Sequence, residues 1–424
     1  MMKKFAKAVV AKILGWQVRR LREKNTFTVV AIAGSIGKTS TKLAIAQLLG
    51  SSQKVQYQDG NYNDIISVPL IFFGMRMPSL LNPLSWVKLI LRIEKQLKRP
   101  YPYDIVVVEL ATDGPGQIAQ FQQYLKADIG VLTAITPEHM EYFEDLDGVA
   151  KEELSISLIS NKILYSSDLI DQKYQQALPS SSISYALKAK AVYQLSDVHR
   201  SKQKYSFNIL YDRVPIIKSD FPASSEIQLY AVCAAVAVAH QLGFELEKIS
   251  SGLKAIMPVP GRMNRLAGIQ GSTIIDDTYN ASPVAVRAAL DAIYNITAPQ
   301  KIAILGNMNE LGKYSADEHR KIGAYCNPKE LALVVTIGAD ANKHLALAAE
   351  ERGCRVMRYK DPFTAGTELR EMIKPGAVIL AKGSQNGVFA EETVKLLLAN
   401  PKDSTKLVRQ SDYWLRLKHK QMGL

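Results

Sequence analysis

The stretch Phe27-Thr-Val-Val-Ala-Ile-Ala-Gly-Ser-Ile-Gly-Lys-Thr-Ser-Thr41 is the most informative part of this chain, and the helical sequence Lys-Leu-Ala-Ile-Ala-Gln-Leu-Leu49 follows it. Residues 27–33 form a nearly all-apolar, β-branched run of the kind that is buried in a parallel sheet. After Lys38 the apolar residues return at helical spacing. The segment is therefore predicted to be a strand, a glycine turn and a helix.

The turn, Gly34-Ser-Ile-Gly-Lys-Thr39, has the residue types of a phosphate-binding loop. Its glycines let backbone N–H groups point toward an anion at a helix N-terminus, where Lys38 can reach the β- and γ-phosphates and Thr39 can ligate Mg²⁺. Ile32 occupies the place of the first glycine in the common P-loop, so this loop is a shorter variant. A strand-to-helix turn that merely contains Gly-Lys-Thr is the alternative.

Composition limits the class of protein. A chain of 424 residues is long enough for two or three domains, and 47% hydrophobic with 22% charged residues is a globular composition. The three scattered cysteines, Cys233, Cys326 and Cys354, indicate neither a disulfide framework nor a zinc site, so a cytoplasmic location is expected. A net charge of +13 suggests acidic partners such as nucleotide phosphates, an anionic precursor, membrane lipid or nucleic acid.

Two helices with basic residues are predicted in the first hundred positions. Residues 3–24 form a basic amphipathic pattern that is too short and too often interrupted by lysine to span a bilayer. This helix either caps the first domain or binds a membrane surface or a partner. A second apolar helix with a basic end is predicted within residues 78–100.

Two further buried-strand patterns each lead to a polar residue. Residues 103–109 end at Glu109, and residues 129–135 are followed by Thr136-Pro-Glu-His139. Open α/β sheets place ligand-binding groups at the carboxyl ends of their strands, so Glu109 and His139 predict a magnesium or proton-handling site beside the phosphate loop. A structural ion pair for Glu109 and a plain hydrogen-bonded role for His139 are the alternatives.

The second half of the chain repeats the α/β pattern. Pro258-Val-Pro-Gly-Arg262 indicates a domain boundary, and strands alternate with helices from residue 272 to residue 399. We therefore predict an α/β protein with a basic amphipathic N-terminal helix (1–25), a P-loop central domain with a mostly parallel sheet (26–260) and a C-terminal Rossmann-like α/β domain (261–424).

Several stretches, in this order, resemble the Mur ligases, ATP-dependent enzymes that build the peptide of bacterial cell walls. The match runs from residue 27 to about residue 400. Folylpolyglutamate synthases share the fold and the loop, but an Asp-x-Ala-His-Asn-Pro segment is expected in those enzymes. The matching stretches are Gly34-Ser-Ile-Gly-Lys-Thr-Ser-Thr41, Asn61-Tyr-Asn-Asp-Ile-Ile-Ser-Val-Pro-Leu70, Val108-Glu109, Asp113-Gly-Pro-Gly116, Thr136-Pro-Glu-His139, Gly261-Arg262, Asp276-Asp-Thr-Tyr-Asn-Ala-Ser-Pro283, Leu305-Gly-Asn-Met-Asn-Glu-Leu-Gly312, His319 and Lys382-Gly-Ser384.

The resemblance implies amide-bond formation through an acyl phosphate, with ATP and Mg²⁺ as cofactors. Such chemistry needs positioning and charge neutralisation more than a covalent catalyst. The implied partners are a small-molecule or peptide cell-wall precursor and an amino acid or a dipeptide such as D-Ala-D-Ala, with no nucleic acid, and a monomer is expected. A ligase for another acidic peptide or polymer, or a nucleotide-binding scaffold without turnover, are the alternatives.

The resemblance also implies roles for individual residues. The phosphates would be bound by Lys38 and by the loop residues Gly34, Ser35, Gly37, Thr39 and Ser40, and at the domain junction by Arg262. One Mg²⁺ would be bound by Thr39 and Glu109, and a second Mg²⁺ by His139. From the C-terminal domain, Asn280 and Asp277 would bind the nucleotide, and Lys382 and Ser384 would bind the incoming amine.

The sequence departs from the family pattern in two places. Family members normally begin with a further domain that grips the UDP-sugar, whereas only about 25 residues precede the first strand here, so a UDP site is not implied. Many members carry a carbamylated lysine fourteen positions after the magnesium histidine, where this chain has Glu153. A carboxylate can supply the same hard oxygen to Mg²⁺, so Glu153 is a predicted metal ligand. An exposed helical glutamate is the alternative.

The two basic helices are predicted to pack near one another. There they would cover or replace the surface that a UDP-gripping domain occupies, and either bind the acidic precursor or hold the enzyme at the inner face of an anionic membrane. A role limited to covering the apolar face of the domain is the alternative. The apolar residues in question are Phe5, Val9, Trp16, Trp86, Ile90 and Ile93.

Overall fold

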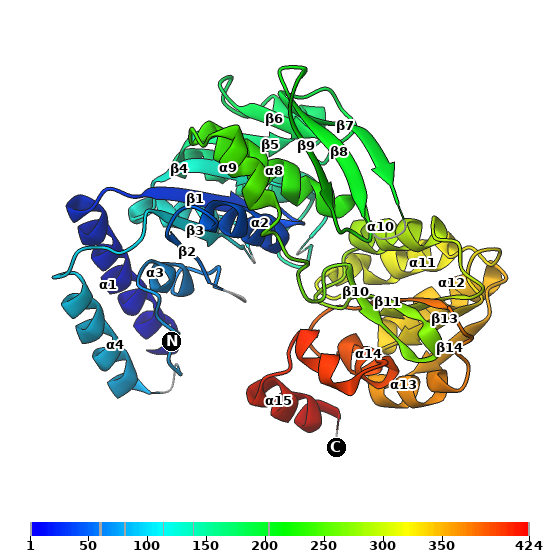
Figure 1. The fold of residues 1–424 in the computed structure, drawn as a ribbon. Helices are drawn as coiled ribbons and strands as arrows, with labels where there is room; N and C mark the ends of the chain where they lie inside the picture. Colours follow the sequence, from blue (N-terminus) through cyan, green and yellow to red (C-terminus); the bar gives the residue numbers. More distant parts are fainter. Residues whose placement is uncertain are drawn as a thin grey trace.

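The computed structural model describes residues 2–58, 62–79, 82–112, 114–138, 140–201 and 204–422, without the side chains of residues 2–6 and 422. These residues form two α/β units, each built on one sheet with helices on both faces (Figure 1). The first unit contains the sequence up to helix α9, and the second begins at strand β10.

The central sheet has nine strands in the order β2-β3-β1-β4-β5-β6-β7-β8-β9. Neighbouring strands from β2 to β7 are parallel, and β7, β8 and β9 form an antiparallel meander at one edge. The prediction of a mostly parallel sheet is confirmed. Its strands are β1 (Thr28–Ala33), β2 (Val55–Gln56), β3 (Ile105–Glu109), β4 (Ala127–Leu132), β5 (Ser160–Ser166), β6 (Ile183–Ala186), β7 (Tyr193–Arg200), β8 (Tyr205–Tyr211) and β9 (Val214–Phe221).

Strand β1 contributes to two hydrophobic cores because its side chains alternate between the two faces of the sheet. Val29 and Ala31 pack into the core beneath α1, α3 and α4, whereas Val30 and Ile32 pack into the core beneath α2, α8 and α9. This explains why residues 29–33 are apolar at every position. The helices of this unit are α1 (Met2–Lys24), α2 (Lys38–Gly50), α3 (Ser67–Phe72), α4 (Pro83–Gln96), α5 (Gln117–Gln120), α6 (Leu146–Leu154), α7 (Gln172–Gln175), α8 (Ile227–Gln241) and α9 (Leu246–Leu253).

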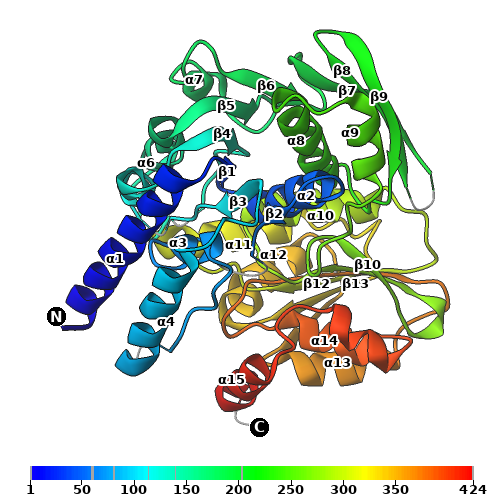
Figure 2. The same cartoon turned by 60° about the vertical axis from the view of Figure 1, so that its left-hand side comes forward.

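Helices α1 and α4 lie side by side on the outside of this unit (Figures 1 and 2). Arg20 of α1 forms an ion pair with Glu94 of α4 at 2.8 Å, and the Gln17 side chain donates to the Ile90 carbonyl at 3.3 Å. The prediction that the two basic helices pack together is confirmed. The apolar residues predicted to share one surface are divided, however, because Trp86 is buried in the core while Trp16 is exposed.

The C-terminal sheet has six strands in the order β10-β11-β15-β12-β13-β14, all parallel except the edge strand β10. Helices α10 and α11 pack on one face, and α13 and α14 on the other. The three cysteines of the chain are buried and free. The elements are β10 (Asn264–Ala267), β11 (Thr273–Asp277), α10 (Pro283–Tyr294), β12 (Lys301–Gly306), α11 (Ser315–Tyr325), β13 (Leu333–Ile337), a π-helical turn (Ala341–Leu345), α12 (Ala346–Glu351), β14 (Val356–Tyr359), α13 (Pro362–Arg370), β15 (Val378–Lys382), α14 (Ala390–Leu397) and α15 (Asp412–Met422).

The basic segment after Pro401 ends in helix α15. This helix is attached through Lys418, whose buried ammonium group lies 2.9 Å from Glu391 and 2.5 Å from Glu392 at the start of α14. Arg409 also pairs with Glu391, at 2.7 Å. Two adjacent buried carboxylates are tolerated only when cations compensate them, so this cluster fixes the C-terminal segment to the sheet.

We expect Lys418→Met to destabilise the C-terminal unit by about 3 kcal/mol or more, because the apolar stem is kept while two buried carboxylates lose a cation. Calorimetric unfolding of the variant would measure this. Lys420→Met, on the exposed side of the same helix, is the matched control and should leave the transition within about 0.5 kcal/mol of the parent. Equal transitions for the two variants would show that the cluster is not stabilising.

Candidate active site

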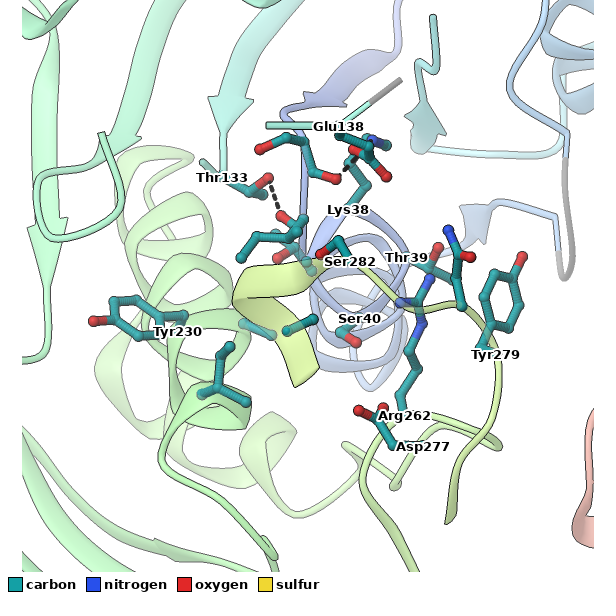
Figure 3. A pocket seen from close by; sticks show the side chains of 18 of the residues that line it. Lys38, Thr39, Ser40, Thr133, Glu138, Tyr230, Arg262, Asp277, Tyr279 and Ser282 are labelled. Carbon is teal, nitrogen blue, oxygen red and sulfur yellow. Dashed lines mark hydrogen bonds and ion pairs between the residues drawn. The ribbon is translucent and has the colours of Figure 1, made fainter. Parts of the chain in front are cut away.

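The loop between β1 and α2 is held against the end of β4. Gly34 and Gly37 both have positive φ angles, of 125° and 83°. A Cβ atom on Gly34 would lie 2.2 Å from the Thr133 hydroxyl oxygen, so only glycine fits there. The Thr133 hydroxyl donates to the Ile36 carbonyl at 2.6 Å, which fixes the crest of the loop (Figure 3). The sequence of this turn therefore positions the N-terminus of α2.

Helix α2 begins at Lys38, immediately after the loop, and its N-cap is Gly37. The Ser35 backbone N–H donates to the Ala134 carbonyl at 2.9 Å, so a second contact ties the loop to the segment that follows β4. A pocket opens at this helix terminus, between the two α/β units. The residues of the loop and of the first turn of α2 that line this pocket are Ser35, Ile36, Gly37, Lys38, Thr39, Ser40 and Thr41.

Lys38 is surrounded by acceptors. Its ammonium group donates to the Gly34 carbonyl and lies 3.4 Å from the Glu138 carboxylate (Figure 3). Burial acts to lower the pKa of Lys38, but the carboxylates of Glu138, Glu153 and Glu109 outweigh it, and the pKa is raised. Lys38 is therefore a firmly protonated cation at the helix N-terminus, which suits it to phosphate binding.

Glu153 is buried on α6, with 3% of its surface exposed, and its Oε2 accepts a hydrogen bond from the Gly34 N–H at 2.5 Å. The alternative of an exposed helical glutamate is therefore wrong. Its neighbour Glu152 is buried too, and accepts from the Gly116 and Ile118 N–H groups at the start of α5.

The charge state of Glu153 follows from these surroundings. Burial, the largest effect, raises the pKa of its carboxyl from 4.5 to about 7. Lys38 and the Gly34 N–H act in the opposite direction, and Glu138 adds to the increase. A cation placed near this carboxylate would favour its ionised form.

Thr39 and Glu109, predicted as ligands of one Mg²⁺, are brought together. The Thr39 hydroxyl donates to Glu109 Oε1 at 3.2 Å, and the carboxylate is buried at the end of β3. Glu109 Oε2 accepts no hydrogen bond among the described residues and lies 3.2 Å from the Lys42 ammonium nitrogen. Glu109 thus forms the structural ion pair that was the alternative prediction, and it also has a carboxylate oxygen that can bind a cation.

This donor set fits Mg²⁺, which takes hard oxygen ligands and commonly completes its shell with water and substrate phosphates. Within the described ranges, no group of three or more His, Cys, Asp or Glu side chains could hold a metal by itself. His139, which was predicted to bind a second metal, lies outside the described residues.

The C-terminal unit completes the pocket from the opposite side. The Arg262 guanidinium lies over the Tyr279 ring, 4.1 Å from its centroid, and both residues line the pocket together with Asn280 (Figure 3). Arg262 Nε is buried and has no hydrogen-bond partner in the part of the chain that the structure describes. The Gln228 side chain of α8 donates to the Arg262 carbonyl at 3.2 Å, which links the two units beside the pocket.

Lys382 and Asp277 form an ion pair at 2.5 Å in the floor of the pocket, and the Lys382 ammonium also donates to the Asn280 carbonyl at 3.0 Å. Burial, opposed by Asp277, lowers the pKa of Lys382. Ser384 is placed differently: its hydroxyl donates to the Ala281 carbonyl and accepts from the Asn309 N–H, and the described lining of the pocket does not include it.

Some residues in or beside the pocket were not assigned roles from the sequence. Glu138 lies within the quoted Thr136–His139 stretch, but its pairing with Lys38 depends on how β4 meets the loop. Lys42 follows Lys38 by one helical turn, so helical spacing could have placed it on the same side of α2. Tyr279 lies within another quoted stretch, and only the structure shows that it stacks on Arg262.

Two family models match this chain in adjacent segments. The Mur ligase middle domain matches residues 32–239, and the Mur ligase glutamate ligase domain matches residues 261–385. The chain belongs to the Mur ligase family. In this Mur ligase the two matched segments correspond to the two α/β units, and the pocket lies between them.

Individual relatives agree with this assignment. A UDP-N-acetylmuramoyl-tripeptide--D-alanyl-D-alanine ligase from Bacillus subtilis is 28% identical over 386 residues, covering 88% of this chain and 76% of that protein. One with the same name from Synechocystis is 26% identical over 399 residues, covering 91% and 77%. The structure of MurF ligase from Thermotoga maritima in complex with ADP superposes with a TM-score of 0.74 at 23% identity, covering 93% and 84%, and shows that the fold is shared.

We expect the stability of the metal-free protein to depend on pH through Glu153. Because the folded pKa of about 7 exceeds the ordinary value of 4.5, the protonated form stabilises the fold, and this contribution is lost as pH rises through about 7. Glu153→Gln removes the titration, so its stability relative to the parent should increase by about 2.5 kcal/mol between pH 5 and pH 8.5 in EDTA.

Thermal unfolding across this pH range measures the difference, with Glu247→Gln at an exposed position as the control. Added Mg²⁺ should stabilise the parent at pH 8.5 more than it stabilises Glu153→Gln. A difference between Glu153→Gln and the parent that stays constant with pH would contradict this account of the carboxyl group.

Proposed function

We propose that this Mur ligase joins a carboxylate and an amine at the expense of ATP, through an acyl phosphate. The observation that supports this most directly is the convergence of phosphate-binding groups from both units on one pocket. Lys38 and Thr39 line it from the central unit, and Arg262 and Asn280 line it from the C-terminal unit. A site divided in this way can hold a nucleotide and two further substrates between domains.

The reaction would proceed in two displacements. An oxygen of the acceptor carboxylate attacks the γ-phosphorus of ATP, so that ADP leaves and an acyl phosphate forms. The amine nitrogen then attacks the acyl carbon, inorganic phosphate leaves, and the nitrogen loses a proton. Both steps gain from alignment of the reactants and from neutralised phosphate charge, which preorganised cations supply.

The residues of the chain would share these tasks. Lys38 and the N–H groups of residues 36–39 bind phosphate oxygens, and Arg262 approaches the same phosphates with its unpartnered Nε. Thr39 and Glu109 would hold Mg²⁺, which when bound neutralises phosphate charge. Glu153, with its hydrogen bond to the loop, and His139 would complete the metal region. Asp277 keeps the Lys382 ammonium group fixed in the pocket floor, where the amine substrate would arrive.

The substrates are proposed from the relatives. Their names specify a UDP-N-acetylmuramoyl-tripeptide and D-alanyl-D-alanine. We propose that this chain likewise extends a cell-wall peptide precursor with an amino acid or a dipeptide such as D-Ala-D-Ala, as a cytoplasmic monomer without a nucleic-acid partner. A different acidic peptide or polymer as acceptor is the second candidate.

Peripheral contact with an anionic membrane is a further part of the proposal. Within the described helices, none has the combined length and apolar character needed to cross a bilayer. Helix α4 nevertheless exposes an apolar stripe at helical spacing, with Leu84, Val87 and Leu91 exposed by 73%, 54% and 57%. Exposed Lys88 and Arg92 adjoin the stripe. Apolar and basic side chains combined in this way are typical of helices that lie on an anionic bilayer.

Replacing Lys38 tests the ligase. Lys38→Ala should lower kcat for ligation roughly a hundredfold or more, because it removes a preorganised cation from the transferring phosphoryl group. Phosphate release measured with candidate carboxylate and amine pairs gives the rate, and Lys254→Ala, at an exposed lysine, is the control. Turnover of a folded Lys38→Ala variant at the parental rate would exclude this use of the loop.

Co-sedimentation with vesicles tests the membrane contact. The parent should bind vesicles containing phosphatidylglycerol at low salt and be released at high salt, because each basic residue contributes only about 1 kcal/mol. Binding should be lost when Leu84, Val87 and Leu91 are replaced by serine. Serine at three other exposed apolar positions, Val214, Met257 and Leu347, should have no effect. A parent protein that stays in the supernatant at low salt would eliminate the contact.

A further inference from the structure

A second pocket lies between helix α1 and the segment of α5 and the 3₁₀ turn that follows it (Phe121–Gln123). The residues of α1 that line it recur about every four positions, so they form one stripe along the helix. Helix α1 thus has two faces with different uses: Leu14 and Val18 pack into the core, and the stripe borders the pocket. The stripe consists of Lys7, Ala8, Ala11, Lys12, Gly15, Trp16 and Arg19.

This α1 groove adjoins the pocket proposed to bind ATP. Asp64, Ala111 and Gln117 line both of them. Ala111 follows the end of β3 by two residues, close in sequence to the Glu109 carboxylate at the proposed metal site. An elongated substrate whose carboxyl end reaches the phosphate loop would therefore have its distal part in the α1 groove.

The groove carries excess positive charge. Lys12 and Arg19 are exposed, and no carboxylate among the described residues pairs with either of them. Lys7 lies 3.5 Å from Asp64, the acidic residue of the lining. Asp64 is already engaged, because its Oδ1 accepts from the N–H groups of Ile66 and Ser67 at 3.0 Å and 2.7 Å. Lys12 and Arg19 are thus available to an anionic ligand.

A buried hydroxyl in the same groove indicates a ligand independently. Tyr124 lines the groove and is only 8% exposed, and its hydroxyl has no hydrogen-bond partner in the described structure. Helix α1 approaches its ring closely, since a Cβ on Gly15 would lie 2.9 Å from Tyr124 Cδ1. Leaving a buried polar group unpaired is costly, so a ligand that accepts a hydrogen bond from Tyr124 would gain affinity.

We propose that the α1 groove binds the diphosphate-bearing end of the acyl acceptor. This inference rests on the proposed ligase function and specifies its acceptor. Lys12 and Arg19 would pair with the phosphate oxygens, because guanidinium and ammonium groups form strong charge-assisted bonds with phosphate. Trp16, which is 48% exposed and covered on one face by Arg20 at 4.3 Å, offers the remainder of its indole surface to the attached group.

A diphosphate of this kind has two possible sources, a soluble nucleotide-linked precursor and a membrane lipid-linked one. Isothermal titration can separate them, using the full chain with its ATP pocket first saturated by a non-hydrolysable ATP analogue and Mg²⁺. The probes are UDP, farnesyl diphosphate and inorganic pyrophosphate. We expect at least one of them to bind, with Kd weakened about tenfold or more in the Lys12→Ala/Arg19→Ala double variant.

Two further variants make the test specific. Tyr124→Phe keeps the ring and removes the unpaired hydroxyl, so it should weaken binding of the same probe several-fold. Lys254→Ala/Arg352→Ala removes two other exposed cations, outside the groove and outside the α4 stripe, and should leave every Kd unchanged. The affinity for the ATP analogue should be the same in all of these proteins.

The possible outcomes are distinct. Groove-dependent binding of UDP but not farnesyl diphosphate supports a nucleotide-linked acceptor, the reverse supports a lipid-linked one, and binding of both or of pyrophosphate alone supports the diphosphate itself. No binding of any probe, or equal binding by the Lys12→Ala/Arg19→Ala variant, overturns the proposal. Absence of ligation with every substrate pair would instead refute the proposed function, and the binding measurements would still report on the groove.

Discussion

The close approach of the β1–α2 turn to the end of β4 is the constraint on which the site depends. At Gly34 the backbone lies so near Thr133 and Ala134 that no side chain fits. The N-terminus of α2 therefore starts directly at the edge of the sheet, where the carboxyl ends of the parallel strands converge. Lys38, Thr39 and the N–H groups of the loop owe their positions to this contact, and so does the hydrogen bond between Gly34 and Glu153.

Charge balance is the second feature that organises the site. Glu109, Glu138 and Glu153 surround Lys38, while Lys42 pairs with Glu109. Three carboxylates around a phosphate-binding loop would repel a nucleotide, unless cations compensate them. Mg²⁺ and the two lysines provide that compensation in the proposed function, which explains why a carboxylate such as Glu153 can be buried beside the loop. The C-terminal unit adds the guanidinium group of Arg262 on the opposite side of the pocket. The pocket is therefore lined by carboxylates and by cations.

Local patterns in the sequence predicted much of the fold, because buried parallel strands and amphipathic helices leave strong signals. Two elements of the C-terminal unit have weak local signals. The short edge strand β14 is only half-buried, and α15 is held by the Lys418 cluster rather than by an apolar face. Lys38, Thr39 and Glu109 could be predicted because each follows or ends a buried strand. The carboxyl ends of parallel strands lie at the same edge of a sheet, so the topology brings these residues together. The burial of Glu153 and the pairing of Lys382 with Asp277 depend on contacts between distant segments, which one sequence does not specify.

The transfer of an oxygen isotope would reveal whether a carboxylate is activated as an acyl phosphate in this pocket. The acceptor UDP-N-acetylmuramoyl-tripeptide, labelled with ¹⁸O in its terminal carboxylate, would be ligated to D-alanyl-D-alanine with ATP, and the released phosphate analysed by mass spectrometry. If an acyl phosphate forms, each phosphate released with a new amide bond should carry one ¹⁸O atom from the acceptor. Amide formation accompanied by unlabelled phosphate, or by AMP and pyrophosphate, would exclude an acyl phosphate intermediate.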